Sequence, residues 1–388
     1  MKYFSVPADF KIETLDKYCY LNSIYHDSKI IETYGQLTEC SILNSGRITD
    51  VLPSVDFASF KSYIRYSKKA GIDFSYTLNP SCFGNYEFSS EGIKNIKEFL
   101  YKIYDVGVDS ITVTTPSLLE IIASTGLKFN TKTSAICEIT SPGKSLFYKR
   151  MGVSRLVIDP DITRNFRAIK NICKVFGDGV EVIVNNLCYK NCAYKMFHYN
   201  HEAHCTSDTK QDVKDYFFNR CAMQKAQNLS NYVKLNWIRP EDLKFYYDCG
   251  IRYFKVQGRQ NILKGDIIKF LHHYMREEFD GDIMDLLTLF NPYNGFQPYI
   301  DNKKLDGFVE RFYLKHDFCE DDCDSCGYCN MFATKSTNIE NASILNENAL
   351  KFYSEYDQYS SLLKKQDNKF QNIIPKLFED EDLTIDFD

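Results

Sequence analysis

One local pattern, repeated four times, most limits the folds open to this chain. An amphipathic stretch ends at a glycine, and a β-branched residue then begins a strand-forming run, as in Ala70-Gly71-Ile72-Asp73. The same order recurs at Val106–Asp109, Met151–Ser154 and Cys249–Arg252. Glycine after a last helical turn adopts the left-handed conformation that closes many helices. Each copy therefore predicts a helix followed by a strand, and repeated units of this kind build a parallel sheet.

Eight β-branched runs are the candidate strands of that sheet. The stretches between them place apolar residues at helical spacing, for example Ile96, Phe99 and Ile103. Eight alternating strands and helices predict an α/β fold of the TIM-like (β/α)8 barrel type, with a doubly wound open sheet as the alternative. The predicted strands are Ile30–Tyr34, Asp73–Leu78, Ser110–Thr114, Lys128–Thr133, Arg155–Ile158, Glu181–Asn185, Tyr232–Asn236 and Arg252–Gln257.

The spacing of these runs also predicts the domain organisation. We expect a barrel domain over residues 1–285, with a cysteine-rich insertion at 186–230 after the sixth predicted strand. A C-terminal extension over 286–388 carries four more clustered cysteines and an acidic tail. Hydrophobic residues make up 44% of the chain and charged residues 26%, which is typical of globular proteins and not of disordered ones.

Charge and hydropathy favour some classes of protein over others. No apolar run approaches the roughly 18 residues of a membrane span, and the first residues lack a cationic-then-apolar secretion signal. We therefore expect a cytoplasmic protein without membrane contact. A net charge of −5 argues against a general nucleic-acid coat. Local basic stretches at 144–155 and 255–269 keep RNA binding open as an option.

Fourteen cysteines in a reducing compartment are more typical of metal binding than of disulfides. One group has three, two and two residues between successive thiols. A loop of that spacing can bring four sulfurs around one zinc ion or one [4Fe–4S] cluster, and spacing alone does not separate these metals. Free or paired thiols are the remaining alternative. The group comprises Cys319, Cys323, Cys326 and Cys329.

A second group follows the sixth predicted strand, at the end of a barrel where active sites are built. Its members are Cys188, Cys192, Cys205 and Cys221. Cys40 and Cys82 each follow a predicted strand and could supply a fourth ligand instead of Cys205 or Cys221. The same insertion carries three histidines that could bind metal, act as acid–base groups or be surface residues. They are His198, His201 and His204.

Polar residues at the ends of other predicted strands suggest a substrate site. The loops after the last two strands of a barrel commonly bind an anion. We therefore predict that Arg239 and Arg259 bind a carboxylate or phosphate, so that Arg239→Ala abolishes ligand binding. Ion pairs with nearby acids such as Glu241 are the alternative. The candidate substrate-binding residues are Arg47, Arg239, Glu241, Lys255, Gln257 and Arg259.

Three segments resemble a known family in the same order. Phe254–Arg259, followed by a helix with Tyr274–Glu278, resembles the Lys-Ile-Glu-Gly-Arg segment of the peptidase U32 family. Gly107–Val113 and Glu181–Cys188 are also similar to family segments, and the likeness covers roughly residues 30–280. This family includes collagenase-like proteins and oxygen-independent hydroxylases of tRNA, rRNA and ubiquinone precursors.

The resemblance implies a barrel that carries a [4Fe–4S] cluster, with Cys188 and Cys192 as ligands, followed by Cys205 and Cys221. Four departures point to a divergent branch. Asn185-Asn186 replaces the family's usual His-Gly, and Gln257 replaces its usual Glu. The cysteine spacing differs from that of the common tRNA-modifying members, and the C-terminal group of four cysteines is extra. One or two clusters are therefore expected, with zinc as the alternative in the C-terminal group, and no substrate is carried over.

Three functions follow from these patterns. The first is an iron–sulfur enzyme for redox or oxygen-independent hydroxylation chemistry on an anionic small molecule, a peptide or an RNA-borne substrate. The second is a U32-type peptidase, although the sequence contains no G-x-S-x-G or H-E-x-x-H motif. The third is a non-catalytic, cluster-bearing scaffold or maturation partner, since 29 Phe and 28 Tyr also suit a protein interface.

Overall fold

A computed structural model describes residues 1–38, 45, 47, 51–204, 213, 215–291, 295–315 and 317–366. Eight parallel strands close into one barrel in chain order, which confirms the predicted TIM-like (β/α)8 fold and excludes the open sheet. The strands are β1 Lys2–Pro7, β2 Ser28–Gly35, β3 Asp73–Leu78, β4 Ser110–Val113, β5 Asn130–Thr133, β6 Arg155–Val157, β7 Val180–Ile183 and β8 Tyr253–Lys255.

One predicted strand is wrong, and one strand was missed. The run at Tyr232–Asn236 overlaps the helix α9, Ser230–Lys234, because a short apolar run does not distinguish a buried helix from a strand. The missing strand is β1, whose Tyr3 and Phe4 pair with Tyr253 and Phe254 of β8 and close the barrel. The cysteine-rich insertion therefore follows the seventh strand, β7, and the last predicted strand is β8.

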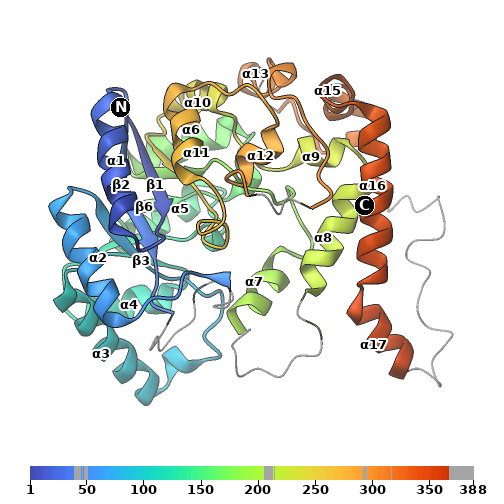
Figure 1. The fold of residues 1–388 in the computed structure, drawn as a ribbon. Coiled ribbons are helices and arrows are strands. Elements are labelled where there is room, and N and C mark those ends of the chain that lie inside the picture. The colour runs from blue at the N-terminus through green and yellow to red at the C-terminus, as the bar shows by residue number, and fades with distance from the viewer. Residues whose placement is uncertain are drawn as a thin grey trace.

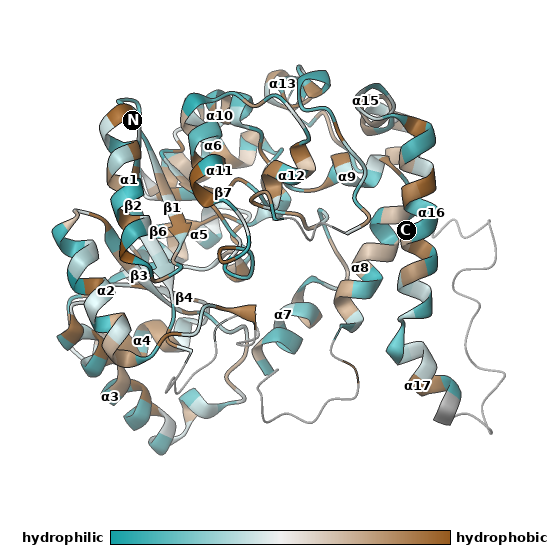
Figure 2. Cartoon of the chain, viewed as in Figure 1, coloured by the Kyte–Doolittle hydropathy of each residue, from teal (hydrophilic) through white to brown (hydrophobic). Residues whose placement is uncertain are grey.

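Four glycines after helices around the barrel confirm the repeated pattern of helix ends. Gly71, Gly107, Gly152 and Gly250 all have positive φ angles after helical segments. These helices carry both hydrophilic and hydrophobic residues, as expected for helices with one buried face (Figure 2). They are α1 Ile12–Ile24, α2 Phe57–Lys69, α3 Ser90–Val106, α4 Pro116–Ser124, α5 Pro142–Arg150, α6 Phe166–Phe176, α10 Leu243–Asp248 and α11 Ile267–Arg276.

Further helices lie beyond one side of the barrel (Figure 1). The insertion forms α7 Lys195–His204, α8 Tyr216–Gln227 and α9. The C-terminal part forms α12 Ile283–Leu287, α13 Glu310–Leu314, α14 Cys323–Cys326, α15 Tyr328–Ser336, α16 Ile339–Glu355 and α17 Gln358–Gln366. Single 3-10 turns occur at Tyr86–Phe88, Ala135–Cys137, Pro160–Ile162, Pro240–Asp242 and Lys303–Leu305.

The C-terminal helices pack on the insertion. Helix α16 runs alongside α8 (Figure 1). The rings of Phe218 and Tyr353 lie 5.9 Å apart, and Arg220 pairs with Asp357 at 2.8 Å. The division into domains at residues 285 and 286 stays a prediction. Within the described ranges, no helix is both long and apolar enough to cross a membrane.

Candidate active site at the carboxyl end of the barrel

Four charged side chains form a buried network inside the barrel. Lys132 of β5 bonds Glu32 of β2 and lies 3.1 Å from Glu181 of β7, and all three are at most 3% exposed. Arg155 of β6 approaches the other oxygen of Glu32 at 3.2 Å. Burial would raise the pKa of Glu32, but attraction to Lys132 and Arg155, with hydrogen bonds from Lys132 and Ser5, lowers it to about 2. Two cations thus balance two carboxylates.

Lys255 of β8 is an additional cation beside this balanced network. Its side chain is buried, and its Nζ atom lies 4.1 Å from the centroid of the Tyr34 ring. Among the residues that the structure describes, no carboxylate lies within ion-pair distance of Lys255. Burial and repulsion by Lys132 lower the pKa of Lys255 to about 8, although Glu181 and Glu32 act in the opposite direction.

A pocket at the carboxyl end of the strands collects three cations. Arg47, Lys255 and Arg259 all line it, and the described lining residues include no aspartate or glutamate. Arg259 Nη1 donates to three neutral oxygens, at 2.8 Å to Ser45, 3.0 Å to Thr77 and 3.2 Å to Gln36. Burial and repulsion by Arg47 lower the pKa of Arg259. The residues that line the pocket therefore carry an excess of positive charge, which Glu202 near Arg259 reduces and an anionic ligand would offset.

The structure brings four of the six predicted substrate residues to this pocket. They are Arg47, Lys255, Gln257 and Arg259. The pocket is also lined by two tyrosines that the sequence-based prediction missed. Tyr34 lies at the carboxyl end of β2, where the predicted first strand ends, and Tyr199 comes from α7 of the insertion. Their aromatic character gave no signal, because tyrosine is common throughout this chain.

Arg239 and Glu241 lie elsewhere, in a structural network. Arg239 is 2% exposed and donates to Asp242 at 2.8 Å, Asp306 at 2.9 Å and the carbonyl oxygen of Asn302 at 2.7 Å. Glu241 accepts hydrogen bonds from the backbone of Phe279 and the side chain of Asn302, each at 2.9 Å. Since two carboxylates already neutralise the guanidinium, the geometry favours the ion-pair alternative and does not support a ligand-binding role for Arg239 or Glu241.

The cysteines of the insertion lie close to the pocket. Cys188 and Cys192 are in the loop after β7, and Cys221 is in α8. Burial and the neighbouring Cys221 raise the pKa of Cys188 to about 11. Cys192 acts in the same direction, and Arg47 acts in the opposite one. Cys205, and Cys40 as its possible substitute, lie outside the described residues. The other substitute, Cys82, accepts a backbone hydrogen bond from Gly84 at 3.3 Å.

Two of the three histidines on α7, His198 and His201, pack against an aromatic side chain. The His198 ring stacks on Phe217 with centroids 5.3 Å apart, and its Nε2 atom is 3.5 Å from Glu202. His201 meets the edge of Phe217 at 5.5 Å. These contacts suit the prediction of surface side chains in an aromatic segment better than that of metal ligands.

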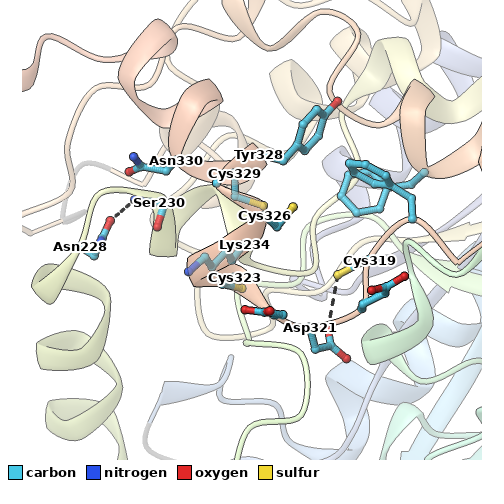
Figure 3. Close-up of a pocket in the computed structure, with 15 residues that line it drawn as sticks. Asn228, Ser230, Lys234, Cys319, Asp321, Cys323, Cys326, Tyr328, Cys329 and Asn330 are labelled. Atoms are coloured by element: carbon cyan, nitrogen blue, oxygen red, sulfur yellow. Dashed lines mark hydrogen bonds between the residues drawn. The ribbon is translucent and has the colours of Figure 1, made fainter. Parts of the chain in front are cut away.

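The four cysteines of the C-terminal group line one pocket together (Figure 3). Its four lining thiols are Cys319, Cys323, Cys326 and Cys329. Phe318 and Tyr328 flank the pocket with their rings 4.9 Å apart. Lys190, in the loop between Cys188 and Cys192, pairs with Asp321 at 2.7 Å. The ion pair thus joins the segments that carry the two cysteine groups.

Both cysteine groups have the ligand chemistry of a zinc or iron–sulfur site, since thiolates are the preferred donors for both. Their geometry is open: within the described part of the chain, no three His, Cys, Asp or Glu side chains are placed to hold a metal ion. Metal binding by either group therefore stays a prediction.

Comparison with known proteins settles the family. Residues 54–275, more than half of the chain, match the model of peptidase family U32. The chain belongs to this family. A curated relative is 29% identical over 298 residues, spanning 77% of this chain and 86% of its own length. It is the uncharacterized protease MJ1657 of Methanocaldococcus jannaschii.

A solved U32 structure is also similar to this chain. The U32 peptidase Mk0906 covers 66% of this chain and 93% of its own, with a TM-score of 0.48 and 16% identity.

In this U32 protein, the side chains of Asn185, Asn186 and Gln257 lie in one hydrogen-bonded group. Asn185 exchanges hydrogen bonds with the backbone of Gln257, donating from Nδ2 to its carbonyl oxygen and accepting from its amide, each at 2.8 Å. Asn186 donates to the Gln257 side chain at 3.2 Å and accepts from the amide of Cys188 at 2.9 Å. The three amides therefore join the end of β7, the end of β8 and the first cysteine.

Proposed function

We propose that this U32 protein is an iron–sulfur enzyme that binds an anionic substrate at the carboxyl end of its barrel. The observation that carries the proposal is the convergence of Arg47, Lys255 and Arg259 on one pocket without a described carboxylate. Lys255 is buried without a carboxylate in ion-pair distance among the described residues, and Arg259 donates hydrogen bonds to neutral oxygens, so an anion in this pocket is favoured. The position at the carboxyl ends of the strands is where barrel enzymes hold their substrates.

The cysteine chemistry supports the second half of the proposal. Cys188, Cys192 and Cys221, with Cys205, would hold a [4Fe–4S] cluster, and the cluster would supply redox chemistry for modification of the bound substrate. The chain's own residues would bind and orient that substrate. Arg47 and Arg259 would fix its anionic group, and the amides of Asn186 and Gln257 would offer hydrogen bonds at the same pocket. The C-terminal group would bind a second cluster or zinc.

Anaerobic purification followed by iron, sulfide and zinc analysis tests the proposal. We expect about four irons per chain for one cluster and about eight for two. The double variant Cys188→Ala/Cys192→Ala should lose about four irons, whereas the matched control Cys19→Ala, in a helix outside both cysteine groups, should lose none. Zinc without iron in the wild-type protein would contradict the iron–sulfur function. Cys326→Ala/Cys329→Ala then assigns the remaining metal to the C-terminal group.

A peptidase is the second candidate, because both similar proteins carry that description: one is called an uncharacterized protease and the other a U32 peptidase. This activity would use the same pocket, with Arg259 binding an acidic side chain or the C-terminal carboxylate of a peptide. Incubation of the purified protein with acidic and neutral peptide pools, followed by mass spectrometry, detects it. Cleavage that is abolished in Arg259→Gln would favour the peptidase. Intact peptides would contradict the peptidase and favour the iron–sulfur enzyme.

A further inference from the structure

Inside the barrel, the amine of Lys255 has no carboxylate partner among the described residues. Glu32 and Glu181 provide two negative charges, and Lys132 and Arg155 bond to them. Lys255 has no carboxylate partner among the described residues, and its Nζ atom lies against the Tyr34 ring instead. A buried lysine next to other cations releases its proton readily, and the neutral amine is a nucleophile.

The guanidinium of Arg259 offers a free edge in the same pocket. Its Nη1 atom makes all three of its recorded hydrogen bonds, to Gln36, Ser45 and Thr77. Within the described residues, neither Nε nor Nη2 of Arg259 has a bonded partner. Two parallel N–H groups of this kind match the two oxygens of a carboxylate. Since Lys255 and Arg259 line one pocket, a carboxylate held by Arg259 brings its neighbouring atoms into the pocket that also contains the amine.

We propose that Lys255 forms a Schiff base with a carbonyl compound whose carboxylate is bound by Arg259, that is, with a 2-oxo acid. This inference names the substrate class for the anion pocket of the proposed function and rests on it. It adds a covalent step for which an unpaired lysine at the end of β8 is suited, whereas pure anion binding needs only the two arginines.

The step balances without an oxidant or a reductant. The lone pair of the Lys255 Nζ atom attacks the carbonyl carbon, and a carbon–nitrogen bond forms as the π pair of the carbonyl moves to its oxygen. That oxygen takes one proton from nitrogen. Loss of the hydroxyl group with the second nitrogen proton releases one water molecule and leaves a carbon–nitrogen double bond. The carboxylate stays on Arg259 throughout.

The acidity of Lys255 fits this role. Burial and repulsion by Lys132, together with Arg259, lower the pKa of Lys255 to about 8, against the opposing effect of Glu181 and Glu32. At pH 7 a lysine with this pKa has roughly 300-fold more neutral amine than one at the ordinary value. Its reactivity should therefore level off above about pH 8, while that of exposed lysines keeps rising.

Two small aldehyde probes test the inference on the anaerobically purified full chain. Glyoxylate and acetaldehyde differ only in a carboxylate against a methyl group, and cyanoborohydride traps either imine as a stable secondary amine. Peptide mapping by mass spectrometry then locates the adduct. At pH 7 we expect glyoxylate to modify Lys255 at least tenfold faster than Lys94, a lysine whose side chain is 73% exposed. Lys255 that stays unmodified while Lys94 reacts would overturn the inference.

Variants separate the covalent role from a purely electrostatic one. Arg259→Gln should remove the preference of Lys255 for glyoxylate over acetaldehyde and keep its reaction with acetaldehyde. Lys255→Arg keeps the positive charge and should lose only the adduct at this position. Equal labelling of Lys255 by the two probes in the wild-type protein would overturn the assignment of a 2-oxo acid.

Iron analysis of the same preparation distinguishes the two proposals. Iron present with Lys255 unlabelled overturns the Schiff base and leaves the iron–sulfur function. Lys255 labelled in a protein without iron overturns the iron–sulfur function and supports the Schiff base.

Discussion

The barrel interior and the cysteine-rich surface present opposite kinds of site. In the barrel, Lys132, Glu32 and Glu181 are at most 3% exposed and tightly paired, yet they come from strands far apart in the sequence. On the surface, Cys319 to Cys329 are adjacent in the sequence, and three of the four thiols are exposed. Contiguous motifs thus mark the surface site, while tertiary packing alone creates the interior one. The predictions below test whether the buried interior contacts contribute more to the free energy of unfolding than the contacts of the cysteine-rich surface.

The largest effect is expected from Lys132→Met. The variant leaves Glu32 and Glu181 buried without their shared partner, and breaking a buried pair typically costs about 3–5 kcal/mol of unfolding free energy. Denaturant unfolding measures the loss. The matched control is Lys94→Met, whose ion pair with Glu98 is exposed and contributes little, within about 0.5 kcal/mol. A loss below about 1 kcal/mol for Lys132→Met would show that the barrel network is not a stabilising feature.

Arg239→Ala comes next. The variant leaves Asp242 buried and unpaired, while Asp306 is 62% exposed and regains water. We expect a loss of about 2–3 kcal/mol, at or below the low end for a buried pair. The control Arg276→Ala removes a pair in which both side chains are more than half exposed, and should cost less than about 1 kcal/mol. Unchanged stability with loss of anion binding would restore the ligand role predicted from sequence.

The loss of stability at acid pH tests the buried network of Glu32, Lys132, Glu181 and Arg155 inside the barrel. The pKa of Glu32 is lowered to about 2 in the folded protein, so its contribution is complete above the unfolded value and is lost as pH falls toward 2. Between pH 5 and pH 3 this group should remove about 2 kcal/mol. Glu32→Gln should flatten the curve by that amount relative to wild type. Parallel curves for the two proteins would contradict the assigned pKa.

The sequence predicted the repeating parts of the fold well. The glycines at 71, 107, 152 and 250 mark helix ends in the structure, because a left-handed residue is a local requirement. The strand β1 was missed because Lys2–Pro7 has no repeated glycine before it and no long β-branched run. Its partners, β2 and β8, are distant in the sequence, so only closure of the barrel identifies it.

The candidate site was predictable in part for the same reason. Lys255 ends β8, Arg47 and Arg259 follow strand ends, and all strands of a parallel barrel end on one face. Arg239 also followed a predicted strand end, but it pairs with Asp242, three residues away, and with Asp306, 67 residues away. The first pair agrees with the alternative of ion pairs with nearby acids, whereas no local pattern could indicate the second. Charged residues within β-branched runs, such as Lys132 and Glu181, were the available signal for the interior network.

The smallest effect is expected where the two cysteine segments meet. Lys190 and Asp321 pair at 2.7 Å, but their side chains are 36% and 52% exposed. Exposed pairs contribute between about 0 and 1 kcal/mol, since water and salt screen them. Lys190→Met should therefore change the unfolding free energy by less than about 1 kcal/mol, and 1 M salt should remove most of the difference from wild type. The segment joined by this pair would then be held by aromatic packing of Phe318 on Tyr328. A loss above about 2 kcal/mol that persists in high salt would mean that the cysteine-rich surface is as rigidly specified as the barrel interior, and the contrast between the two regions would fail.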